Sequence, residues 1–443
     1  MKALHILATI ATAAIACACS RPAQTGTSWS VPEPCDVVMY QVNPRVFAPD
    51  NSFKAVGAHL DSIKALGTNV VWFMPICEIG RDEKAKSSPY CVGNYREINP
   101  EYGTIEDFKH SIEECHKRGM CVIMDWVANH SSWDNPWITE HPEWYTHNED
   151  GEIIFPEGTN WEDVADFNFD NPEMRQAMID AMKFWVTEIG LDGFRCDAAD
   201  FVPFDFWKQC VSAMRAIPGR KVLMLAEGGR KDHFEAGFEM NYAWSYMGTL
   251  RRVFNSRGHA AAYELFEADA EEYEGIPDGC VKLRFTTNHD ETSKMSPIRE
   301  FHGERGSMAA FVATVFIHGG PLIYSSQEIG YPGSINFFHY VPMDWHANSD
   351  LYEEYRTLMG LYNSHPALRK GTINPFPDEH VLAFERETAD ETILIIDNLF
   401  QEYTVMDTPA GWSGRKCTDL MSGKTVTLGK TIAIDPYQYL ILK

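Results

Sequence analysis

The feature that most constrains the fold of this chain is a regular alternation of short apolar segments with longer amphipathic ones. Eight apolar segments are expected to form strands: residues 36–47, 69–76, 121–127, 191–197, 221–227, 238–244, 282–288 and 321–326. Helices rich in Ala, Glu, Lys and Met are expected between most of them, at 54–66, 104–118, 172–188, 203–216, 245–257 and 305–317. Near-continuous apolar strands are buried on both faces, and strand–helix alternation requires parallel crossovers. The alternation therefore predicts an α/β fold, a closed (β/α)8 TIM barrel whose chemistry lies at the C-terminal rim.

Two segments break this alternation. The segment after the third strand has no helical period and contains four tryptophans, Trp133, Trp137, Trp144 and Trp161. We expect a short inserted domain there, which would wall one side of a cleft. Beyond about residue 364 the pattern changes to short alternating runs, which predict a C-terminal antiparallel β-sandwich with strands at 380–386, 392–399, 424–429 and 437–443. The predicted boundaries are 31–130 and 167–365 for the barrel, 131–166 for the inserted domain and 366–443 for the β-sandwich.

Residues 1–30 are expected to be a signal peptide and a tether. Lys2 precedes an apolar stretch, residues 3–18, that suits a signal peptide and is too short and weak for a membrane span. The segment resembles a bacterial lipoprotein signal, which implies a lipidated Cys17 or Cys19 and an exported, periplasmic or outer-membrane-associated protein. The Leu usual three residues before the cysteine is absent at both positions, so simple secretion is the alternative.

Charge and cysteine content limit the classes of partner and site. The net charge of −25 argues against a nucleic-acid partner, because phosphate backbones require clustered Lys and Arg. A neutral substrate fits this charge, although solubility outside the cell would also explain it. The nine cysteines beyond the leader form no CxxC pair and match no zinc-site spacing, so we interpret them mostly as small buried apolar residues. Nothing in the sequence indicates an oligomeric state.

Three acidic residues lie where predicted strands end: Asp197, Glu227 and Asp290. Gathered at one rim of a barrel, they would form a site that breaks a glycosidic bond, which needs one ionised carboxylate and one protonated carboxyl. A single such residue is more often part of a salt bridge or a loop. Their shared position at strand ends reverses that preference.

Arg195 indicates which carboxylate stays ionised. It lies two residues before Asp197 on one strand, so both side chains project to the same face, and the guanidinium is expected to lower the pKa of Asp197. Asp197 is therefore expected to be the nucleophile. Glu227 would face the like charges of Asp197 and Asp290, which raise its pKa and suit a general acid and base. Asp290 is expected to stabilise an oxocarbenium-like transition state electrostatically.

Four motifs resemble, in order and separation, the sequence regions of the α-amylase family of glycoside hydrolases, glycoside hydrolase family 13. They are DWVANH (125–130), GFRCDAAD (193–200), LAEG (225–228) and FTTNHD (285–290). The resemblance extends to YQVNPRVF on the first strand, SPYCVGNYREINPEYGT (88–104), ADFNFDNP (165–172) and PLIYSSQEIG (321–330). It implies a (β/α)8 barrel with a short inserted domain and a C-terminal β-sandwich.

The resemblance also implies roles for individual residues. Asp197 matches the nucleophile of the family, Glu227 the acid/base and Asp290 the transition-state stabiliser. Tyr90 matches the aromatic residue on which the sugar stacks, and the positions that hold the sugar or support the catalytic groups are matched by Asp125, His130, Arg195 and His289. On their own, the two histidines would be interpreted as core or loop residues, and Tyr90 equally as core packing.

Two positions bear on metal binding. The nucleophile is followed by AADF, where many calcium-dependent members have a Lys-His pair. Asn129 stands where the family often supplies a calcium ligand, but the insert lacks an evident run of oxygen ligands. We expect no required metal or cofactor, with a calcium ion as the alternative.

These observations predict a retaining α-glucan hydrolase that cleaves α-glucosidic bonds, of the α-1,4 type, in starch-derived or malto-oligosaccharides through a covalent glycosyl-enzyme. Retention requires the carboxyls of Asp197 and Glu227 to lie about 5 to 5.5 Å apart. A transglycosylase, an α-1,6-acting glucosidase and an inactive sugar-binding relative are the alternatives, because loops decide among activities that share one machinery. The tryptophans of the insert would either stack on glucose units or form its core.

Overall fold

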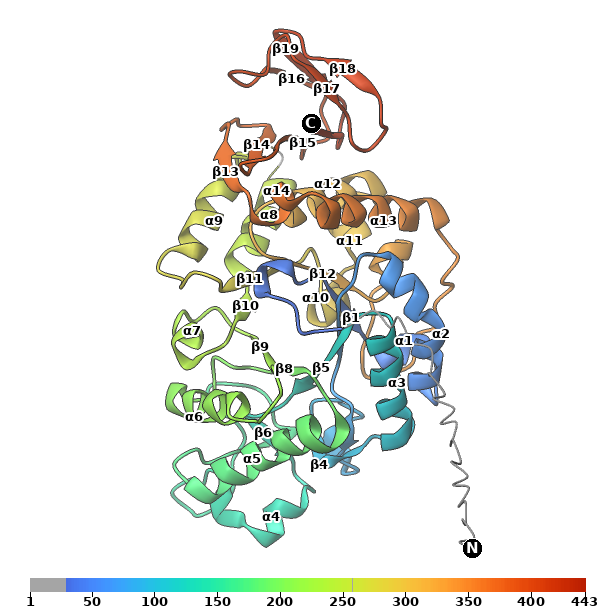
Figure 1. The fold of residues 1–443 in the computed structure, drawn as a ribbon. Helices are drawn as coiled ribbons and strands as arrows, with labels where there is room; N and C mark the ends of the chain where they lie inside the picture. Colours follow the sequence, from blue (N-terminus) through green and yellow to red (C-terminus); the bar gives the residue numbers. More distant parts are fainter. Residues whose placement is uncertain (1–28, 257) are drawn as a thin grey trace, which may run out of the picture.

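The computed structural model describes residues 29–256 and 258–443 of the chain. The expected signal peptide and the candidate lipidation sites Cys17 and Cys19 lie outside the described residues. Among the residues that are described, no helix is both long and apolar enough to cross a membrane. Figure 1 shows a helix-covered barrel with a β-domain at one end.

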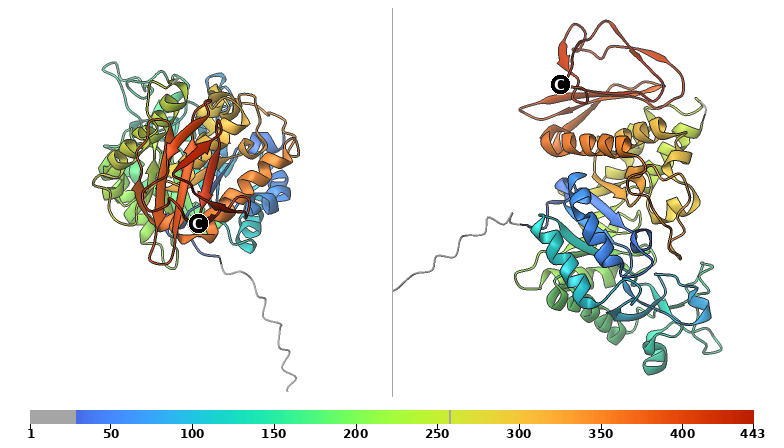
Figure 2. Two further views of the ribbon diagram at one scale, coloured as in Figure 1. Left: turned by 90° about the horizontal axis from the view of Figure 1, so that it is seen from above. Right: turned by 90° about the vertical axis from the view of Figure 1, so that its right-hand side faces the viewer.

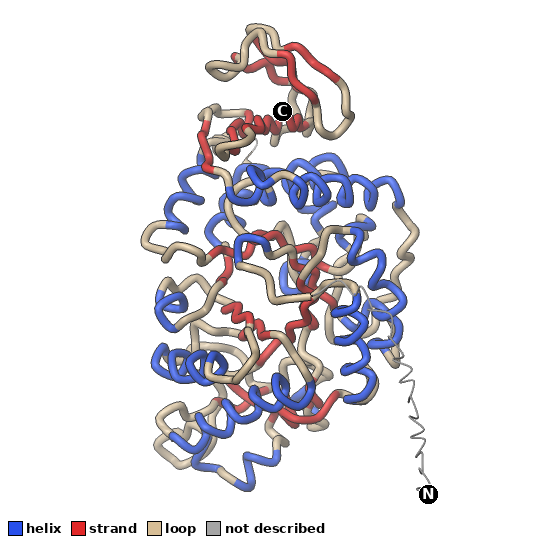
Figure 3. Tube along the Cα trace, viewed as in Figure 1, coloured by secondary structure: helices blue, strands red, loops and turns tan. Residues whose placement is uncertain are grey.

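Eight parallel strands close into a barrel, in which β1 pairs with β2 on one side and with β12 on the other. In spatial order the strands are β1 (Met39–Val42), β12 (Gly320–Tyr324), β11 (Val281–Arg284), β10 (Met240–Tyr242), β9 (Leu223–Ala226), β8 (Gly193–Cys196), β5 (Cys121–Trp126) and β2 (Val70–Phe73). Figure 3 shows these strands in red within a layer of blue helices. Each overlaps one of the predicted strands, so the prediction of a closed α/β barrel is confirmed.

Side chains along the barrel strands alternate between the barrel interior and the helical layer. On β2, Val70 and Trp72 belong to the interior core, whereas Val71 and Phe73 pack outward against the helices. This two-sided burial explains why the strands are apolar at nearly every position. The cysteines of the described residues are free thiols, and Cys121 and Cys196 are buried within strands, which confirms their interpretation as small apolar residues.

Helices cover the outside of the barrel. The longer ones are α2 (Ser52–Ala65), α3 (Ile105–Lys117), α5 (Pro172–Phe184), α6 (Phe204–Arg215), α8 (Trp244–Asn255), α9 (Glu264–Tyr273), α12 (Glu304–Val315) and α13 (Ser349–Ser364). All six predicted helices are present, and α9 and α13 are additional. A capping box formed by Thr104 and Asp107 starts α3. The short helices are α1 (Pro44–Phe47), α4 (Pro136–Glu140), α7 (Asp232–Ala236), α10 (His289–Lys294), α11 (Pro297–Glu300) and α14 (Pro366–Lys370).

Two excursions from the barrel lie together beyond its C-terminal rim. The predicted insert contains the antiparallel pair β6 (His130–Ser132) and β7 (Val164–Asp166). A second antiparallel pair, β3 (Cys77–Ile79) and β4 (Val92–Ile98), follows β2 and was not predicted. The Tyr95 hydroxyl of β4 donates to the backbone oxygen of His130 at 2.7 Å. The wall beside the site is therefore built from both excursions.

The C-terminal domain is antiparallel, as predicted. A four-stranded sheet has the order β13 (Thr372–Pro375), β14 (Val381–Glu387), β15 (Thr392–Asn398) and β20 (Tyr439–Leu442). Two further pairs are β16 (Thr404–Asp407) with β19 (Thr431–Ile434), and β17 (Lys416–Thr418) with β18 (Thr425–Thr427). Phe384 and Ile395 belong to the core shared with the barrel helices, whereas Leu394 and Ile396 belong to the core of the C-terminal domain itself. Figure 2 shows this domain beyond the helices at one side of the barrel.

Candidate active site

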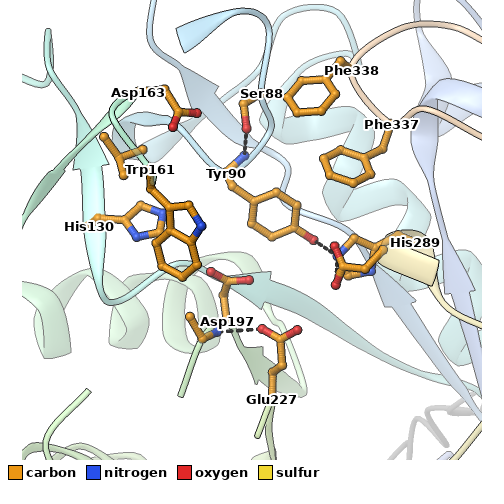
Figure 4. Close-up of a pocket in the computed structure, with 13 residues that line it drawn as sticks. Ser88, Tyr90, His130, Trp161, Asp163, Asp197, Glu227, His289, Phe337 and Phe338 are labelled. Carbon is orange, nitrogen blue, oxygen red and sulfur yellow. Dashed lines mark hydrogen bonds and ion pairs between the residues drawn. The ribbon is translucent and has the colours of Figure 1, made fainter. Parts of the chain in front are cut away.

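The three predicted carboxylates line one hollow at the C-terminal rim of the barrel. Asp197 directly follows β8, Glu227 directly follows β9, and Asp290 lies in α10 after β11. They meet because the carboxyl ends of parallel barrel strands share one rim. The hollow has a volume of about 240 Å³ (Figure 4), and its other lining residues are Ser88, Tyr90, His130, Trp161, Asp163, Val164, Ala198, His289, Phe337 and Phe338.

Arg195 is the cation at the base of this site and is fully buried. Its Nη1 donates hydrogen bonds to Asp125 Oδ1 at 2.5 Å and to Asp197 Oδ1 at 2.7 Å. Its Nη2 forms an ion pair with Glu227 Oε1 at 2.7 Å, and its Nε donates to the Tyr242 hydroxyl at 3.1 Å. One planar guanidinium therefore orients three carboxyl groups relative to one another.

Glu227 has the environment of a proton donor. Burial raises the pKa of its carboxyl well above the usual range; Arg195 opposes this shift, and the nearby Asp197 and Asp290 add to it. Its Oε2 accepts a hydrogen bond from the backbone N–H of Ala198 at 2.7 Å. Ala198 has a φ of 43°, in the left-handed region, so the backbone turns sharply at the residue whose N–H binds Glu227. The raised pKa favours a carboxyl that keeps its proton near neutral pH.

A series of hydrogen bonds holds Tyr90 and His289 beside Asp125. The Gln41 Nε2 lies 2.8 Å from His289 Nδ1. The His289 Nε2 lies 2.5 Å from the Tyr90 hydroxyl, which lies 3.2 Å from Asp125 Oδ2. Burial holds the pKa of His289 well below its usual range, so the ring is neutral. The bonds are all satisfied when Gln41 donates to Nδ1, Nε2–H donates to Tyr90, and Tyr90 donates to Asp125.

The remaining predicted residues complete the same site. Asp125 lies on β5, and burial, opposed by Arg195, raises its pKa to about 7. His130 begins β6, and its ring centroid lies 5.5 Å from that of Trp161. Of the predicted residues, Asp125 and Arg195 lie beneath the hollow, and the other six line it. The structure thus brings all eight together, while their catalytic roles remain predictions.

The positions that depart from the family motifs have contacts of their own. The Asp200 carboxylate accepts hydrogen bonds from the backbone N–H groups of Gly229 at 3.1 Å and Arg230 at 3.3 Å, just beyond Glu227. The Asn129 Nδ2 lies 3.3 Å from His130 Nδ1. Within residues 29–256 and 258–443, no group of three or more His, Cys, Asp and Glu side chains is placed to hold a metal ion.

Several residues of the site lie outside the sequence motifs. Phe337 and Phe338 come from the irregular loop that precedes α13, and Tyr242 comes from β10. The sequence signal that could have indicated Phe337 and Phe338 is an adjacent pair of aromatic residues in a segment without helical or strand periodicity. Among the tryptophans of the insert, Trp144 is buried and Trp161 lines the hollow, so the core and the site each contain one. The other two, Trp133 and Trp137, are partly buried and pack against the core.

Comparison with known proteins identifies the family of this chain. Residues 48–372 match the family described as the α-amylase catalytic domain, and residues 373–441 match the maltogenic amylase C-terminal domain. The chain belongs to the α-amylase family. It is a glycoside hydrolase by family, and the resemblance carried by the four motifs is confirmed.

Relatives within the α-amylase family differ in activity. An α-amylase of Haloarcula japonica is 29% identical over 411 residues, covering 88% of this chain and 58% of that protein. An α-1,4-glucan:maltose-1-phosphate maltosyltransferase of Rhodospirillum rubrum is 24% identical over 400 residues, covering 81% of this chain and 56% of that protein. The chain thus spans less than two thirds of the length of either relative. The solved structure of a noncanonic maltogenic α-amylase from Thermotoga neapolitana has a TM-score of 0.82 at 25% identity, covering 92% of this chain and 98% of that one. These similarities support a glycosidase or a transglycosylase.

Proposed function

We propose that this enzyme is a retaining α-glucan hydrolase that cleaves α-1,4-glucosidic bonds in starch-derived malto-oligosaccharides. The observation that carries the proposal is the position of one guanidinium between two carboxyls. Asp197 binds Nη1 of Arg195 and Glu227 binds Nη2, each at 2.7 Å. Two carboxyls on neighbouring nitrogens of one planar group are held close, as double displacement with retention requires.

In the first step, a carboxylate oxygen of Asp197 forms a bond to C1 of the sugar as the glycosidic C1–O bond breaks. The electron pair of that bond goes to the leaving oxygen, which takes the proton of Glu227. In the second step, a water molecule gives a proton to Glu227 and its oxygen attacks C1, which releases Asp197. Asp290, which also lines the hollow, stabilises the positive charge that develops on the sugar ring.

The sugar that reacts is held by the group around Tyr90. Its phenol ring offers a flat face to a pyranose, and its hydroxyl is fixed by His289 and Asp125. The neutral His289 ring lines the hollow and offers a polar group to the sugar hydroxyls, while Asp125 holds the Tyr90 hydroxyl from beneath. His130, on the opposite wall beside Trp161, completes the binding group.

The stereochemistry of hydrolysis tests this proposal. The reducing sugar first formed from maltoheptaose, followed by proton NMR before mutarotation, is expected to be the α-anomer. Asp197→Asn should abolish turnover without unfolding the protein, because the side chains have the same shape. A β-anomer as first product, or substantial turnover by Asp197→Asn, would contradict the double-displacement mechanism.

One observation favours transglycosylation as a second candidate activity. Phe201 is 52% exposed, and its ring centroid lies 5.1 Å from that of Trp161, which lines the hollow. Phe201 follows the Ala198 turn that binds Glu227, so this aromatic pair lies near the proposed acid. An exposed aromatic pair there suits an acceptor sugar that competes with water. Products longer than the substrate, formed when maltose is added as acceptor, would identify a transferase.

We also propose that the enzyme is exported and lipid-anchored. The support is the leader alone, with Lys2, the apolar stretch 3–18 and the cysteines Cys17 and Cys19. Incorporation of a labelled fatty acid into the expressed protein is expected, and the variant of one of these cysteines, Cys17→Ser or Cys19→Ser, should remove it. A secreted protein that carries no label would contradict the lipid anchor and support simple secretion.

A further inference from the structure

Phe337 forms one end of the hollow, next to the residues that hold the sugar that remains on the enzyme after cleavage. Its ring centroid lies 5.7 Å from that of Tyr90 and 5.5 Å from that of His289. Figure 4 shows Phe337 and Phe338 beyond Tyr90 and His289, away from Glu227 and Trp161. In the proposed mechanism Tyr90 and His289 hold the sugar that is attacked, whereas Glu227 protonates the group that departs. Phe337 therefore meets the part of the chain that remains on the enzyme.

A second hollow adjoins the first at these rings. It has a volume of about 470 Å³ and is lined by Asp290, Phe337 and Phe338, which it shares with the first hollow, and by Trp244, Glu291, Ser293, Lys294 and Asn336. The stacked rings of Phe337 and Phe338, with centroids 4.8 Å apart, line both hollows where the two adjoin. Space for further glucose units therefore exists beside the site, and we interpret the two rings as a partition between this space and the reacting sugar.

Arg45 holds this partition in place. It lies in α1, and its side chain is 2% exposed. Its Nη1 donates to the backbone oxygen of Phe337 at 3.0 Å, and its own backbone oxygen accepts from the N–H of Val341 at 3.0 Å. Residues 330–348 contain no helix or strand, so few backbone hydrogen bonds of their own fix this loop. Arg45 thus supplies two of the bonds that anchor it.

The same guanidinium also holds the loop that carries Tyr90. Its Nη1 donates to the backbone oxygen of Ser87 at 2.7 Å, and the hydroxyl of the next residue, Ser88, accepts from the Tyr90 N–H at 3.2 Å. Both oxygens of Glu101 accept from Arg45, at 2.9 Å and 2.8 Å, which fixes the plane of the guanidinium. One buried group therefore fixes the Phe337 wall and the Tyr90 platform relative to each other.

We propose that Arg45 is a positioning residue that holds Phe337 as the end wall of the sugar-binding hollow, and that this wall restricts the enzyme to releasing short sugars from chain ends. The inference rests on the proposed α-glucan hydrolase activity and names the part of the substrate that the site accepts. Arg45 lies outside the reacting groups and acts through the two loops that it joins.

Digestion of maltoheptaose labelled at its reducing end tests this inference, with labelled products separated in the initial phase. The wild type should release glucose or maltose and leave labelled maltohexaose or maltopentaose. In Arg45→Gln and in Phe337→Ala, the fraction of labelled maltotetraose and shorter products should rise about fivefold or more, because the chain can then enter the second hollow. Glu101→Gln, which frees the guanidinium plane, should shift the pattern in the same direction.

A matched control separates positioning from stability. Arg284 is also buried and paired with two carboxylates, Asp269 at 2.5 Å and Glu272 at 2.8 Å, but lies away from the hollow. Arg284→Gln should lower the melting temperature without changing the product pattern. If Arg45→Gln does not fold, Phe337→Ala decides the question, because it leaves the pair of Arg45 with Glu101 intact. An unchanged product pattern in the folded variants, or mid-chain cleavage by the wild type, would overturn the inference. No cleavage by the wild type would overturn the proposed function itself.

Discussion

The backbone N–H of Ala198 donates a hydrogen bond of 2.7 Å to Oε2 of Glu227. The other oxygen of Glu227 pairs with Nη2 of Arg195, so both oxygens of this carboxyl are held. The turn at Ala198 immediately follows Asp197, whose carboxylate binds Nη1 of the same guanidinium. The proposed acid and the proposed nucleophile are thus fixed relative to each other by one backbone turn and one side chain.

The role of Glu227 as acid predicts a dependence on the leaving group. Glu227→Gln should lower turnover of maltoheptaose by about 10² to 10⁴-fold, since its leaving oxygen needs a proton. Formation of the glycosyl-enzyme from an α-glucosyl fluoride, whose leaving group needs little protonation, should fall far less. Steady-state and burst kinetics on both substrates check this. Equal losses on the two substrates would remove Glu227 from the acid role.

The raised pKa of Glu227 predicts the alkaline limb of the pH profile. Burial favours the protonated carboxyl, and only this form can donate a proton. Activity on maltoheptaose should therefore fall as pH rises through the pKa of Glu227, which lies well above the usual value of 4.5. In Glu227→Gln, the residual activity on the fluoride should lack this limb. An alkaline limb that persists unchanged in the variant would assign it to another group.

Arg195 should contribute strongly to stability, because three carboxyls depend on it. Arg195→Gln leaves Asp125, Asp197 and Glu227 without their cation and should cost about 3 to 5 kcal/mol in the free energy of unfolding. Arg81, whose side chain is 82% exposed and pairs with Glu78, provides the comparison. Arg81→Gln should change stability by less than about 1 kcal/mol. If urea unfolding shows similarly small losses of unfolding free energy in both variants, a structural role for the buried cation is contradicted.

Much of the site could be predicted from the local sequence pattern, whereas contacts between distant segments could not. Asp197 and Glu227 follow buried apolar strands directly, so the shared rim of a parallel barrel brings them together. The position of Arg195 two residues before Asp197 likewise needs nothing beyond strand alternation. The catalytic roles assigned to these residues remain predictions, because neither their burial nor their pairing reports a reaction.

The features that were missed depend on contacts between distant segments. Arg45 and Phe337 are 292 residues apart, and no local period connects them. The pair β3–β4 is short and irregular in register, so its alternation is too weak to predict. In the C-terminal domain, by contrast, β15 is apolar at consecutive positions because the barrel helices cover one face of its sheet and the remaining strands cover the other.

Glu328 predicts a pH-dependent component of stability outside the catalytic group. Its Oε1 accepts from the Tyr40 hydroxyl at 2.6 Å, and burial raises its pKa from 4.5 to about 7. Between these values the folded state binds a proton that the unfolded state does not, so this contribution is present at low pH and is lost as pH rises through about 7. The loss should reach about 3 kcal/mol by pH 8. Urea unfolding of Glu328→Gln at pH 5 and pH 8 should lack this component, and parallel pH dependence in the two proteins would contradict it.

The most direct test of the central claim is identification of the residue that bonds to the sugar. The enzyme would be treated with a fluorinated α-glucosyl fluoride that forms the glycosyl-enzyme faster than water resolves it, and the labelled peptide sequenced by mass spectrometry. We predict a single ester at Asp197 and no label in Asp197→Asn. A label on Glu227 or Asp290, or turnover with inversion and no label, would contradict the proposed mechanism.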